Sequence, residues 1–292
     1  MQILLTGATG FIGSHFSTLA ESRGHQILPV SRKSRPGGYD WSPASLEAGV
    51  AAADAIVHLA GENLFGKRWT EKQKRVLVES RVAPTGRLAR LAAQRRPSVF
   101  VSASAVGYYG PSEIEGLDES APPGNDFLAR LVQQWEEAAA PAKAAGVRTV
   151  HPRFGVVLGA EAGALKQMLP PFKLGVGGPI GSGRQWLSWI HAADVAALLL
   201  FLVETPAGNG PWNATAPNPV TMREMASTLG KVLHRPAILP VPGFALKAAL
   251  GEVADVLLTG QHVVPKRALE AGFAFRFPLL EEALRDLLAR RT

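Results

Sequence analysis

Three glycines near the N-terminus constrain this chain more than any other feature. Gly7, Gly10 and Gly13 directly follow the apolar run Ile3–Leu5 and open a predicted helix that extends to about Arg23. In such a strand–turn–helix unit, the first glycine permits a tight turn, the second allows close backbone approach to a pyrophosphate, and the third allows tight helix packing. Free N–H groups at the helix start favour an anion. The motif predicts a dinucleotide site; a glycine-rich turn without a ligand is the alternative.

The end of the second predicted strand, at 26–31, indicates which dinucleotide binds. An acidic residue here would bind the ribose 2′-hydroxyl of NAD. The chain instead has Ser31, Arg32 and Lys33, with no acid before Asp40. Because an arginine can pair with a 2′-phosphate through charge-assisted hydrogen bonds, we predict NADP(H) as the cofactor. The alternative is that Arg32 and Lys33 belong to a solvated loop.

Strands and helices alternate through the first half of the chain. Short runs rich in Val, Ile and Leu predict parallel strands, buried on both faces, at about 2–6, 26–31, 54–59, 98–103 and 147–153. Helices are predicted between them, notably over 70–95 and 126–145. This alternation predicts an α/β fold with a doubly wound parallel sheet of the Rossmann type.

The pattern changes after Gly155. The glycine-rich segment 175–184 predicts a loop or small hairpin, and a buried helix beginning near Asp194 is predicted to return to the sheet. Later predicted elements are a segment at 221–233, a strand near 237–241, and helices at 243–258 and 279–290. We therefore predict a nucleotide-binding domain over 1–158, to which 190–216 returns, and a smaller substrate lobe formed by 159–189 and 217–292.

Composition limits the classes of function. The chain has no cysteine, which excludes disulfides, thiolate catalysis and cysteine-based metal sites, and its histidines show no metal-ligand spacing. The net charge of +7 is spread along the sequence and suits anionic cofactors or substrates at least as well as nucleic acid. The N-terminus does not match a signal peptide, and the longest apolar run, 195–203, is too short to span a bilayer. We expect a cytoplasmic protein that binds a small-molecule substrate, and neither nucleic acid, membranes nor metal.

Ligands of doubly wound sheets bind beyond the carboxyl ends of the strands. Each of these five ends contains small, polar or basic residues: Gly7–Gly13, Ser31–Arg32, Leu59–Asn63, Ser102–Ser104 and Arg153–Gly155. This convergence favours a cofactor cleft more strongly than the glycine loop alone. The predicted cofactor contacts from the first three ends are Gly7, Thr9, Gly10, Phe11, Ile12, Gly13, Ser31, Arg32, Leu59, Ala60 and Gly61.

Several motifs resemble those of extended short-chain dehydrogenases/reductases. More narrowly, they resemble the NADP-binding branch called epimerase family proteins, which is similar to the NAD-dependent epimerase/dehydratases. The motifs cover nearly the whole chain: Thr6–Gly13, His58–Asn63, Arg68–Thr70, Ser80–Val82, Ser102–Gly110, Pro170–Phe172, Gly177–Gly183, Trp189–His191, Asn213–Asn218, Pro265–Arg267 and Glu270–Phe273. The resemblance implies the fold and NADP(H), but no particular substrate. It also implies that Arg81 and Arg153 contact phosphate or the nicotinamide end, with structural salt bridges as the alternative.

The resemblance also indicates where catalysis should occur. Active relatives use a Ser or Thr, a Tyr that acts as acid/base, and a Lys four residues after that Tyr. Ser104 matches the family serine, but Asn125–Trp135, where Tyr-x-x-x-Lys is expected, contains neither tyrosine nor lysine. Tyr108 and Tyr109 follow Ser104 closely, so one of them is the candidate proton donor, with an arginine supplying positive charge. The alternative is that both tyrosines are packing residues.

Two functions remain open at this point. The first is an NADP(H)-dependent oxidoreductase or epimerase, in which Ser104 and Tyr108 or Tyr109 hold the oxygen of a small polar substrate. The second is a non-catalytic protein that holds NADP(H) as a sensor or structural ligand and regulates a partner, because the Tyr-x-x-x-Lys pair is missing. Dimerisation through helices is common in the wider family, so the resemblance leaves a homodimer as one option.

Overall fold

A parallel sheet forms the centre of the protein in the computed structural model, which describes residues 1–33, 37–206 and 208–289. The sheet has eight strands in the order β11-β7-β5-β4-β1-β2-β3, with β6 beside β7, and all of its pairings are parallel. The strands are β1 (Gln2–Thr6), β2 (Gln26–Ser31), β3 (Tyr39–Asp40), β4 (Ala55–His58), β5 (Val99–Ser102), β6 (Ser104–Ala105), β7 (Thr149–Phe154) and β11 (Gly210–Ala214). The strand order reverses next to β1, so the predicted doubly wound α/β fold is confirmed.

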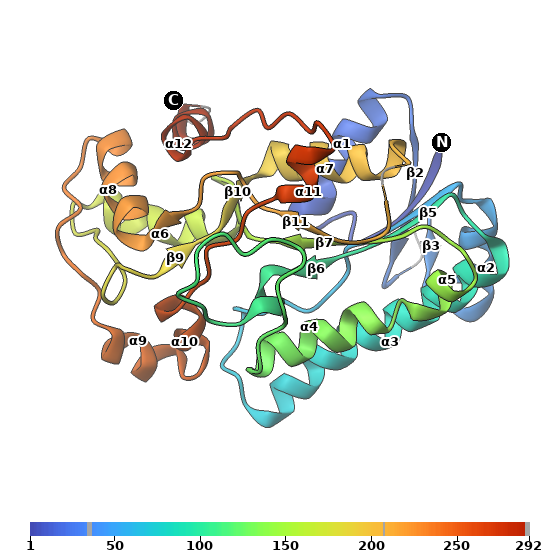
Figure 1. Cartoon of the computed structure of the whole chain (residues 1–292), viewed down its shortest axis with the longest axis horizontal. Helices are drawn as coiled ribbons and strands as arrows, with labels where there is room; N and C mark the ends of the chain where they lie inside the picture. The colour runs from blue at the N-terminus through green and yellow to red at the C-terminus, as the bar shows by residue number, and fades with distance from the viewer. Residues whose placement is uncertain (34–36, 207, 290–292) are drawn as a thin grey trace.

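Helices cover both faces of this sheet (Figure 1). One face packs on α1 (Phe11–Ser22) and α7 (Ala192–Glu204). The other lies under α2 (Pro43–Ala52), α3 (Glu71–Arg95), α4 (Phe127–Glu137) and α5 (Ala140–Ala144). Successive residues of β1 explain this layering, because Ile3 and Leu5 enter one core cluster whereas Leu4 enters the other.

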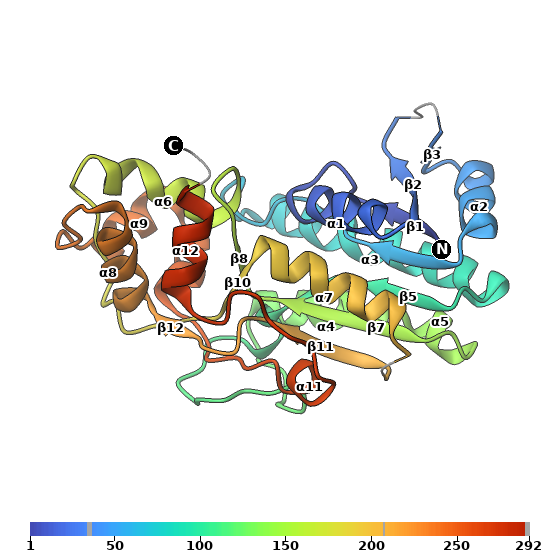
Figure 2. The same ribbon diagram turned by 90° about the horizontal axis from the view of Figure 1, so that it is seen from above.

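A smaller lobe lies beside the carboxyl ends of the strands (Figure 2). Its core is formed mainly by α6 (Gly163–Lys173), α8 (Met222–Leu233) and α12 (Leu280–Ala289). Two short ladders are separate from the central sheet: β8 (Val156–Leu158) with β10 (Trp189–His191), and β9 (Trp186–Leu187) with β12 (Val220–Thr221). The remaining helices are α9 (Gly243–Leu250), α10 (Val253–Leu258), α11 (Lys266–Glu270) and the 3₁₀ turn η1 (Val106–Tyr109).

Three predicted elements differ from those observed. The expected strand at 237–241 is absent, and only Val241 forms an isolated bridge, with Ile180. Prolines at 236, 240 and 242 cannot donate the N–H groups that a ladder requires. The helix expected over 243–258 is divided into α9 and α10, because Gly251 adopts a φ of 64°. The helix expected over 126–145 is likewise divided into α4 and α5.

None of the helices in the described ranges is both long and apolar enough to cross a membrane. α3 is long, with 25 residues, but it carries many charged side chains. α7 is rich in leucine, but it has only 13 residues, and its apolar side chains are buried against the sheet and α1.

Candidate functional site

The glycine loop after β1 leaves the start of α1 open to a ligand. Gly7 has a φ of 76°, and a Cβ on Gly13 would lie 2.1 Å from the Gly7 carbonyl oxygen. Gly10 is the N-cap of α1, no side chain caps the helix, and its first turn contains no acidic residue. Backbone N–H groups and the helix dipole therefore face an uncovered position, which fits a pyrophosphate.

The other predicted loop residues surround this helix start. Thr9 and Gly10 are exposed, whereas Ile12 packs against the sheet core. The Phe11 ring lies so close to Gly159 that a Cβ there would be 2.3 Å from its Cζ atom. The segment that leaves β8 for the smaller lobe therefore contacts the first residue of α1.

A buried histidine, missed in the sequence, fixes the loop after β4 beside the glycine loop. Thr6 Oγ1 accepts the N–H groups of Leu59 at 3.2 Å and Ala60 at 3.1 Å, and lies 2.6 Å from His58 Nδ1. The Thr6 hydroxyl therefore donates its hydrogen bond to His58 Nδ1, and the proton of the neutral ring is assigned to Nε2. Burial, assisted by the charge of Arg81, lowers the pKa of His58 to about 3, so the ring is neutral. This network holds Ala60 next to Gly7, where an added Cβ would be 3.0 Å from the Ala60 nitrogen.

The basic pair after β2 is exposed. Ser31 ends this strand, and its hydroxyl donates to the Lys33 carbonyl. Arg32 is exposed and forms no ion pair with any carboxylate in the described ranges. Its guanidinium is therefore available to an anion at this edge of the sheet.

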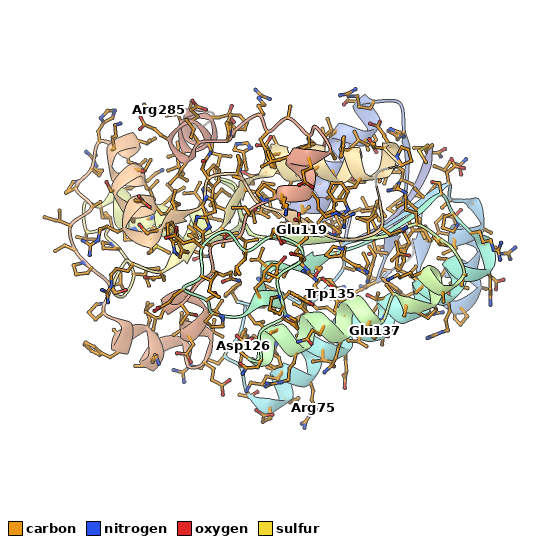
Figure 3. All side chains as sticks on the ribbon, viewed as in Figure 1. Arg75, Glu119, Asp126, Trp135, Glu137 and Arg285 are labelled. Carbon is orange, nitrogen blue, oxygen red and sulfur yellow. The ribbon has the colours of Figure 1, made fainter. Side chains whose placement is uncertain are left out.

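Arg81 lies beneath the loop after β4. Its Nη2 donates to the Glu62 carbonyl at 2.8 Å, its Nη1 donates to the Leu77 carbonyl at 3.1 Å, and its guanidinium stacks 5.1 Å from the Trp135 ring. Trp135 projects from α4 toward the sheet, as Figure 3 shows. Burial lowers the pKa of Arg81 to about 10, against the opposing charge of Glu62. Because a Cβ on Gly61 would be 3.3 Å from Arg81 Cζ, the guanidinium supports this loop directly.

Ser104, the predicted catalytic serine, is hydrogen-bonded to a glutamate that was not predicted from the sequence. Ser104 Oγ donates to Glu136 Oε1 at 2.6 Å. Arg153 donates to the same carboxylate through Nε and Nη2, both at 2.8 Å. Glu136 lies one helical turn after Val132 and two after Leu128, on the buried face of α4. That spacing was the available signal, since an acid on a buried helix face requires a cationic partner.

The ion pair between Glu136 and Arg153 keeps both side chains charged. Burial raises the pKa of Glu136, but the hydrogen bond and the charge of Arg153 lower it by more than burial raises it. The net shift of this pKa is therefore downward. Burial lowers the pKa of Arg153, whereas Glu136 and Tyr109 raise it, with an upward net shift. The side chain of Arg153 is 3% exposed and that of Glu136 is 14% exposed, so a buried guanidinium and a largely buried carboxylate lie next to Ser104.

The structure distinguishes the two candidate tyrosines. Tyr109 donates its hydroxyl proton to Asn213 Oδ1 at 2.7 Å and accepts Arg153 Nη1 at 3.0 Å, and burial raises its pKa. Tyr108 is half-buried, and its hydroxyl has no hydrogen-bond partner within the described residues. The Arg153 guanidinium lies 3.4 Å from the centroid of the Tyr108 ring. Tyr109 is held in a buried network, whereas the ring of Tyr108 faces a cation and its hydroxyl stays free of hydrogen bonds to the described residues.

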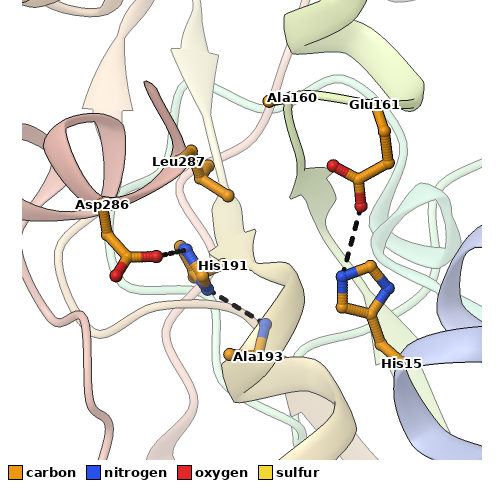
Figure 4. A pocket seen from close by; sticks show the side chains of 7 residues that line it. All are labelled: His15, Ala160, Glu161, His191, Ala193, Asp286 and Leu287. Atoms are coloured by element: carbon orange, nitrogen blue, oxygen red, sulfur yellow. Dashed lines mark hydrogen bonds and ion pairs between the residues drawn. The ribbon is translucent and has the colours of Figure 1, made fainter. Parts of the chain in front are cut away.

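A separate cavity of about 220 Å³ lies between α1, α12 and the start of α7 (Figure 4). His15 Nε2 lies 3.2 Å from Glu161 and His191 Nε2 lies 3.4 Å from Asp286, while His191 Nδ1 accepts the Ala193 N–H as the cap of α7. Across the described ranges, no group of three or more His, Asp or Glu side chains is arranged to hold a metal. The predicted cofactor and catalytic residues do not line this cavity.

Comparisons with known proteins agree with this geometry. Residues 3–214 match the NAD dependent epimerase/dehydratase family, and residues 241–287 match a domain of unknown function, DUF1731. The epimerase family protein YfhF of Bacillus subtilis is 42% identical over 100% of this chain and 99% of its own length.

Two solved structures extend the comparison. The human epimerase family protein SDR39U1, crystallised with NADPH, is 39% identical with a TM-score of 0.92, and the match covers 100% of both chains. A nucleoside-diphosphate sugar epimerase from Corynebacterium glutamicum is 33% identical with a TM-score of 0.81, over 98% of this chain and 58% of that one. These matches confirm the resemblance inferred from the motifs, and the chain belongs to the NAD dependent epimerase/dehydratase family.

Proposed function

We propose that this protein binds NADP(H) across the glycine loop and acts as an oxidoreductase or epimerase of the extended short-chain dehydrogenase type. The uncovered start of α1 and the glycines that a Cβ would block support the pyrophosphate position. The NADPH complex of the human relative supports the same cofactor. The residues proposed to hold it are Gly7, Thr9, Gly10, Phe11, Ile12, Gly13, Ser31, Arg32, Leu59, Ala60 and Gly61, and the smaller lobe is proposed to hold the substrate.

Arg32 provides a direct test of cofactor preference. We expect Arg32→Ala to weaken NADPH binding about 10- to 100-fold, as for the loss of one or two charge-assisted hydrogen bonds. NADH, which has no 2′-phosphate, should bind equally to both proteins. Calorimetric titration of each protein with each dinucleotide measures this, with exposed Arg23→Ala as the control. An equal loss for NADH would contradict the assignment.

The free hydroxyl of Tyr108 carries the catalytic part of the proposal. When bound, NADPH supplies a hydride to a carbonyl carbon. Tyr108 would donate its proton to the carbonyl oxygen, and the neighbouring guanidinium of Arg153 stabilises the phenolate that remains. Ser104 already donates its proton to Glu136, so its oxygen can still accept a hydrogen bond from a substrate hydroxyl. The nitrogens of Arg153 are bound to Glu136 and Tyr109, which favours charge support over a phosphate contact.

Tyr108→Phe tests this role. We expect turnover to fall about 10²- to 10⁴-fold, the usual contribution of a positioned proton donor, while the Kd for NADPH stays unchanged. Tyr109→Phe is the matched control, because it removes a buried hydrogen-bond donor. Its main effect should be a lower free energy of unfolding, with a smaller effect on turnover. Turnover of both variants is measured by steady-state NADPH oxidation, and their stability by urea unfolding. Equal turnover of Tyr108→Phe and the parent would exclude Tyr108 as the proton donor.

One observation favours the second candidate function, a non-catalytic NADP(H) sensor. Ser104 and Tyr109 are both committed to bonds within the protein, so only Tyr108 remains for proton transfer. A sensor would bind NADPH with the Arg32-dependent preference but would not oxidise it with any carbonyl compound. Measurable NADPH oxidation that depends on Tyr108 distinguishes the enzyme from the sensor.

A further inference from the structure

Half of the large apolar side chains that are exposed in the described ranges lie on two segments of the smaller lobe. The segment 173–181 leaves the end of α6, and the segment 235–244 runs from α8 into α9. Their exposed apolar side chains, which we call the apolar tip, are Leu174, Val176, Ile238, Leu239, Val241 and Phe244. Three of them, Leu174, Ile238 and Phe244, are 77–79% exposed. Isolated exposed apolar residues are ordinary, but a set on adjoining segments indicates a binding surface.

Backbone hydrogen bonds hold the two segments side by side. Val241 donates its N–H to the Pro179 carbonyl at 2.9 Å, and its carbonyl accepts the Gly181 N–H at 2.9 Å. Gly178 permits the close approach, because a Cβ there would lie 2.1 Å from the Leu239 carbonyl oxygen. Three prolines fix further φ angles in the second segment. A defined backbone therefore presents the apolar side chains, so that a partner can bind them at a small cost in conformational entropy.

The apolar tip lies at one end of the molecule. α8 and α9, which the second segment connects, occupy one end of the long axis, and β2 lies toward the opposite end (Figure 1 and Figure 2). No residue of α9 is buried. A partner on the apolar tip would therefore leave uncovered the edge of the sheet at which Arg32 is proposed to bind the cofactor.

The charge around the apolar tip is positive. Neither 162–193 nor 225–251, the two stretches that contain it, has an aspartate or a glutamate. Lys166 and Lys173 lie seven residues apart on α6, are exposed, and form no ion pair with a carboxylate of the described residues. Arg235, which is also exposed and without such a pair, donates through Nε to the Lys173 carbonyl at 3.2 Å. Cations beside exposed apolar side chains favour an anionic partner.

These features distinguish between three kinds of partner. A second copy of the chain, related by a two-fold axis through the apolar tip, would bring like charges together, which disfavours self-association. A protein partner is usually anchored by side chains that fill pockets, whereas Leu174, Ile238 and Phe244 protrude. Protruding apolar side chains flanked by lysine and arginine suit an anionic lipid surface, which attracts the cations and covers the apolar groups without a shaped pocket.

We propose that the apolar tip docks on the surface of an anionic lipid bilayer. The protruding apolar side chains would enter the boundary between headgroups and acyl chains, while Lys166, Lys173 and Arg235 contact lipid phosphates. Surface contact requires no spanning helix, so it is consistent with the helices of the described ranges. It differs from the expectation that the protein avoids membranes, because the sequence does not show which apolar residues stay exposed. The docking is independent of the proposed function, since it uses none of the proposed cofactor or catalytic residues.

Vesicle flotation of the full chain tests this proposal. One set of vesicles contains phosphatidylcholine alone, and the other contains equal parts of phosphatidylcholine and phosphatidylglycerol. We expect the protein to float with the anionic vesicles only and to be released as the salt concentration rises, because salt screens exposed charges. Absence of binding to the anionic vesicles, or equal binding to both compositions, would overturn the proposal.

A double variant measures the apolar contribution. Ile238→Ser with Phe244→Ser should weaken binding to anionic vesicles at least about tenfold, because less apolar surface is removed from water. Phe65→Ser with Ile114→Ser is the matched control, since Phe65 and Ile114 are 52% and 69% exposed outside the apolar tip. Vesicle binding that survives the loss of Ile238 and Phe244, or that the control pair weakens equally, would overturn the assignment.

A second double variant measures the charge contribution. Lys166→Gln with Lys173→Gln should weaken anionic-vesicle binding about 25-fold, at about fivefold for each cation near the surface. Lys72→Gln with Arg75→Gln, two exposed cations of α3, is the control and should leave binding nearly unchanged. Equal losses in both pairs would show attraction by net charge alone and overturn the assignment.

Analytical ultracentrifugation tests the alternative of a second copy. The parent is expected to sediment identically to Ile238→Ser with Phe244→Ser, since the apolar tip is proposed to bind lipid. Self-association of the parent that this double variant abolishes, together with no vesicle binding, would assign the apolar tip to a second copy and overturn the proposal.

Discussion

Gly13→Ala is expected to abolish measurable NADPH binding. The new methyl group would lie 2.1 Å from the Gly7 carbonyl oxygen and 2.9 Å from its carbon, and both are backbone atoms that no rotamer change can move. The start of α1 must therefore shift away from the loop. Its free backbone N–H groups then no longer point at the same pyrophosphate position. Each charge-assisted hydrogen bond contributes about 1.5–3 kcal/mol, so the loss of two lowers affinity about 100-fold or more. Overpacking should also lower the free energy of unfolding by about 1–3 kcal/mol.

Gly86→Ala is the control for this variant. Gly86 is also helical, but a Cβ there would be 3.4 Å from the end of the flexible Arg90 side chain. Alanine in a helix is favoured over glycine by about 0.5–1 kcal/mol, so stability should stay equal or rise, with unchanged NADPH affinity. Calorimetry and thermal unfolding of both variants provide the comparison. NADPH binding by Gly13→Ala at the parent affinity would show that the glycine loop is not the cofactor site.

Glu136→Ala should be among the most destabilising single substitutions in the chain. It would leave the Arg153 guanidinium, which is 3% exposed, buried without its carboxylate and would also remove the acceptor of Ser104. Breaking one side of a buried ion pair costs about 3–5 kcal/mol. Urea unfolding measures this against Glu137→Ala, since Glu137 is exposed on the next position of α4 (Figure 3). Equal values for the two variants would show that the buried pair adds no stability.

The same pair predicts a pH dependence. Because the folded protein holds the pKa of Glu136 below its usual value of 4.5, the stabilisation is complete above that value and is lost as pH falls through the lower folded pKa. The parent should therefore lose more stability than Glu136→Gln on acidification below pH 4.5. Adding Arg153→Met to Glu136→Gln should recover part of the stability, since no unpaired charge then remains buried. Parallel losses in parent and single variant would contradict the shifted pKa.

The regular part of the fold was predictable because its causes are local. Short apolar runs specify buried parallel strands, and the glycine spacing specifies the turn between β1 and α1, so both were located from sequence alone. Where local signals conflicted, prediction failed: the run near 237–241 is apolar, but its prolines prevent a ladder, and Gly251 divides the helix expected over 243–258.

The sequence by itself determined the glycine loop, the basic end of β2 and the family, because these depend on residues that are contiguous in the chain. Only the tertiary structure decided the chemistry of the centre. It pairs Glu136 with Arg153 across 17 residues and joins Tyr109 to Asn213 across 104, which leaves Tyr108 with the free hydroxyl. It also packs Leu250 and Val256 against the buried cluster to which Leu128 of α4 belongs. Such contacts join residues from distant segments, and no local pattern specifies which distant side chains will neutralise, orient or cover one another.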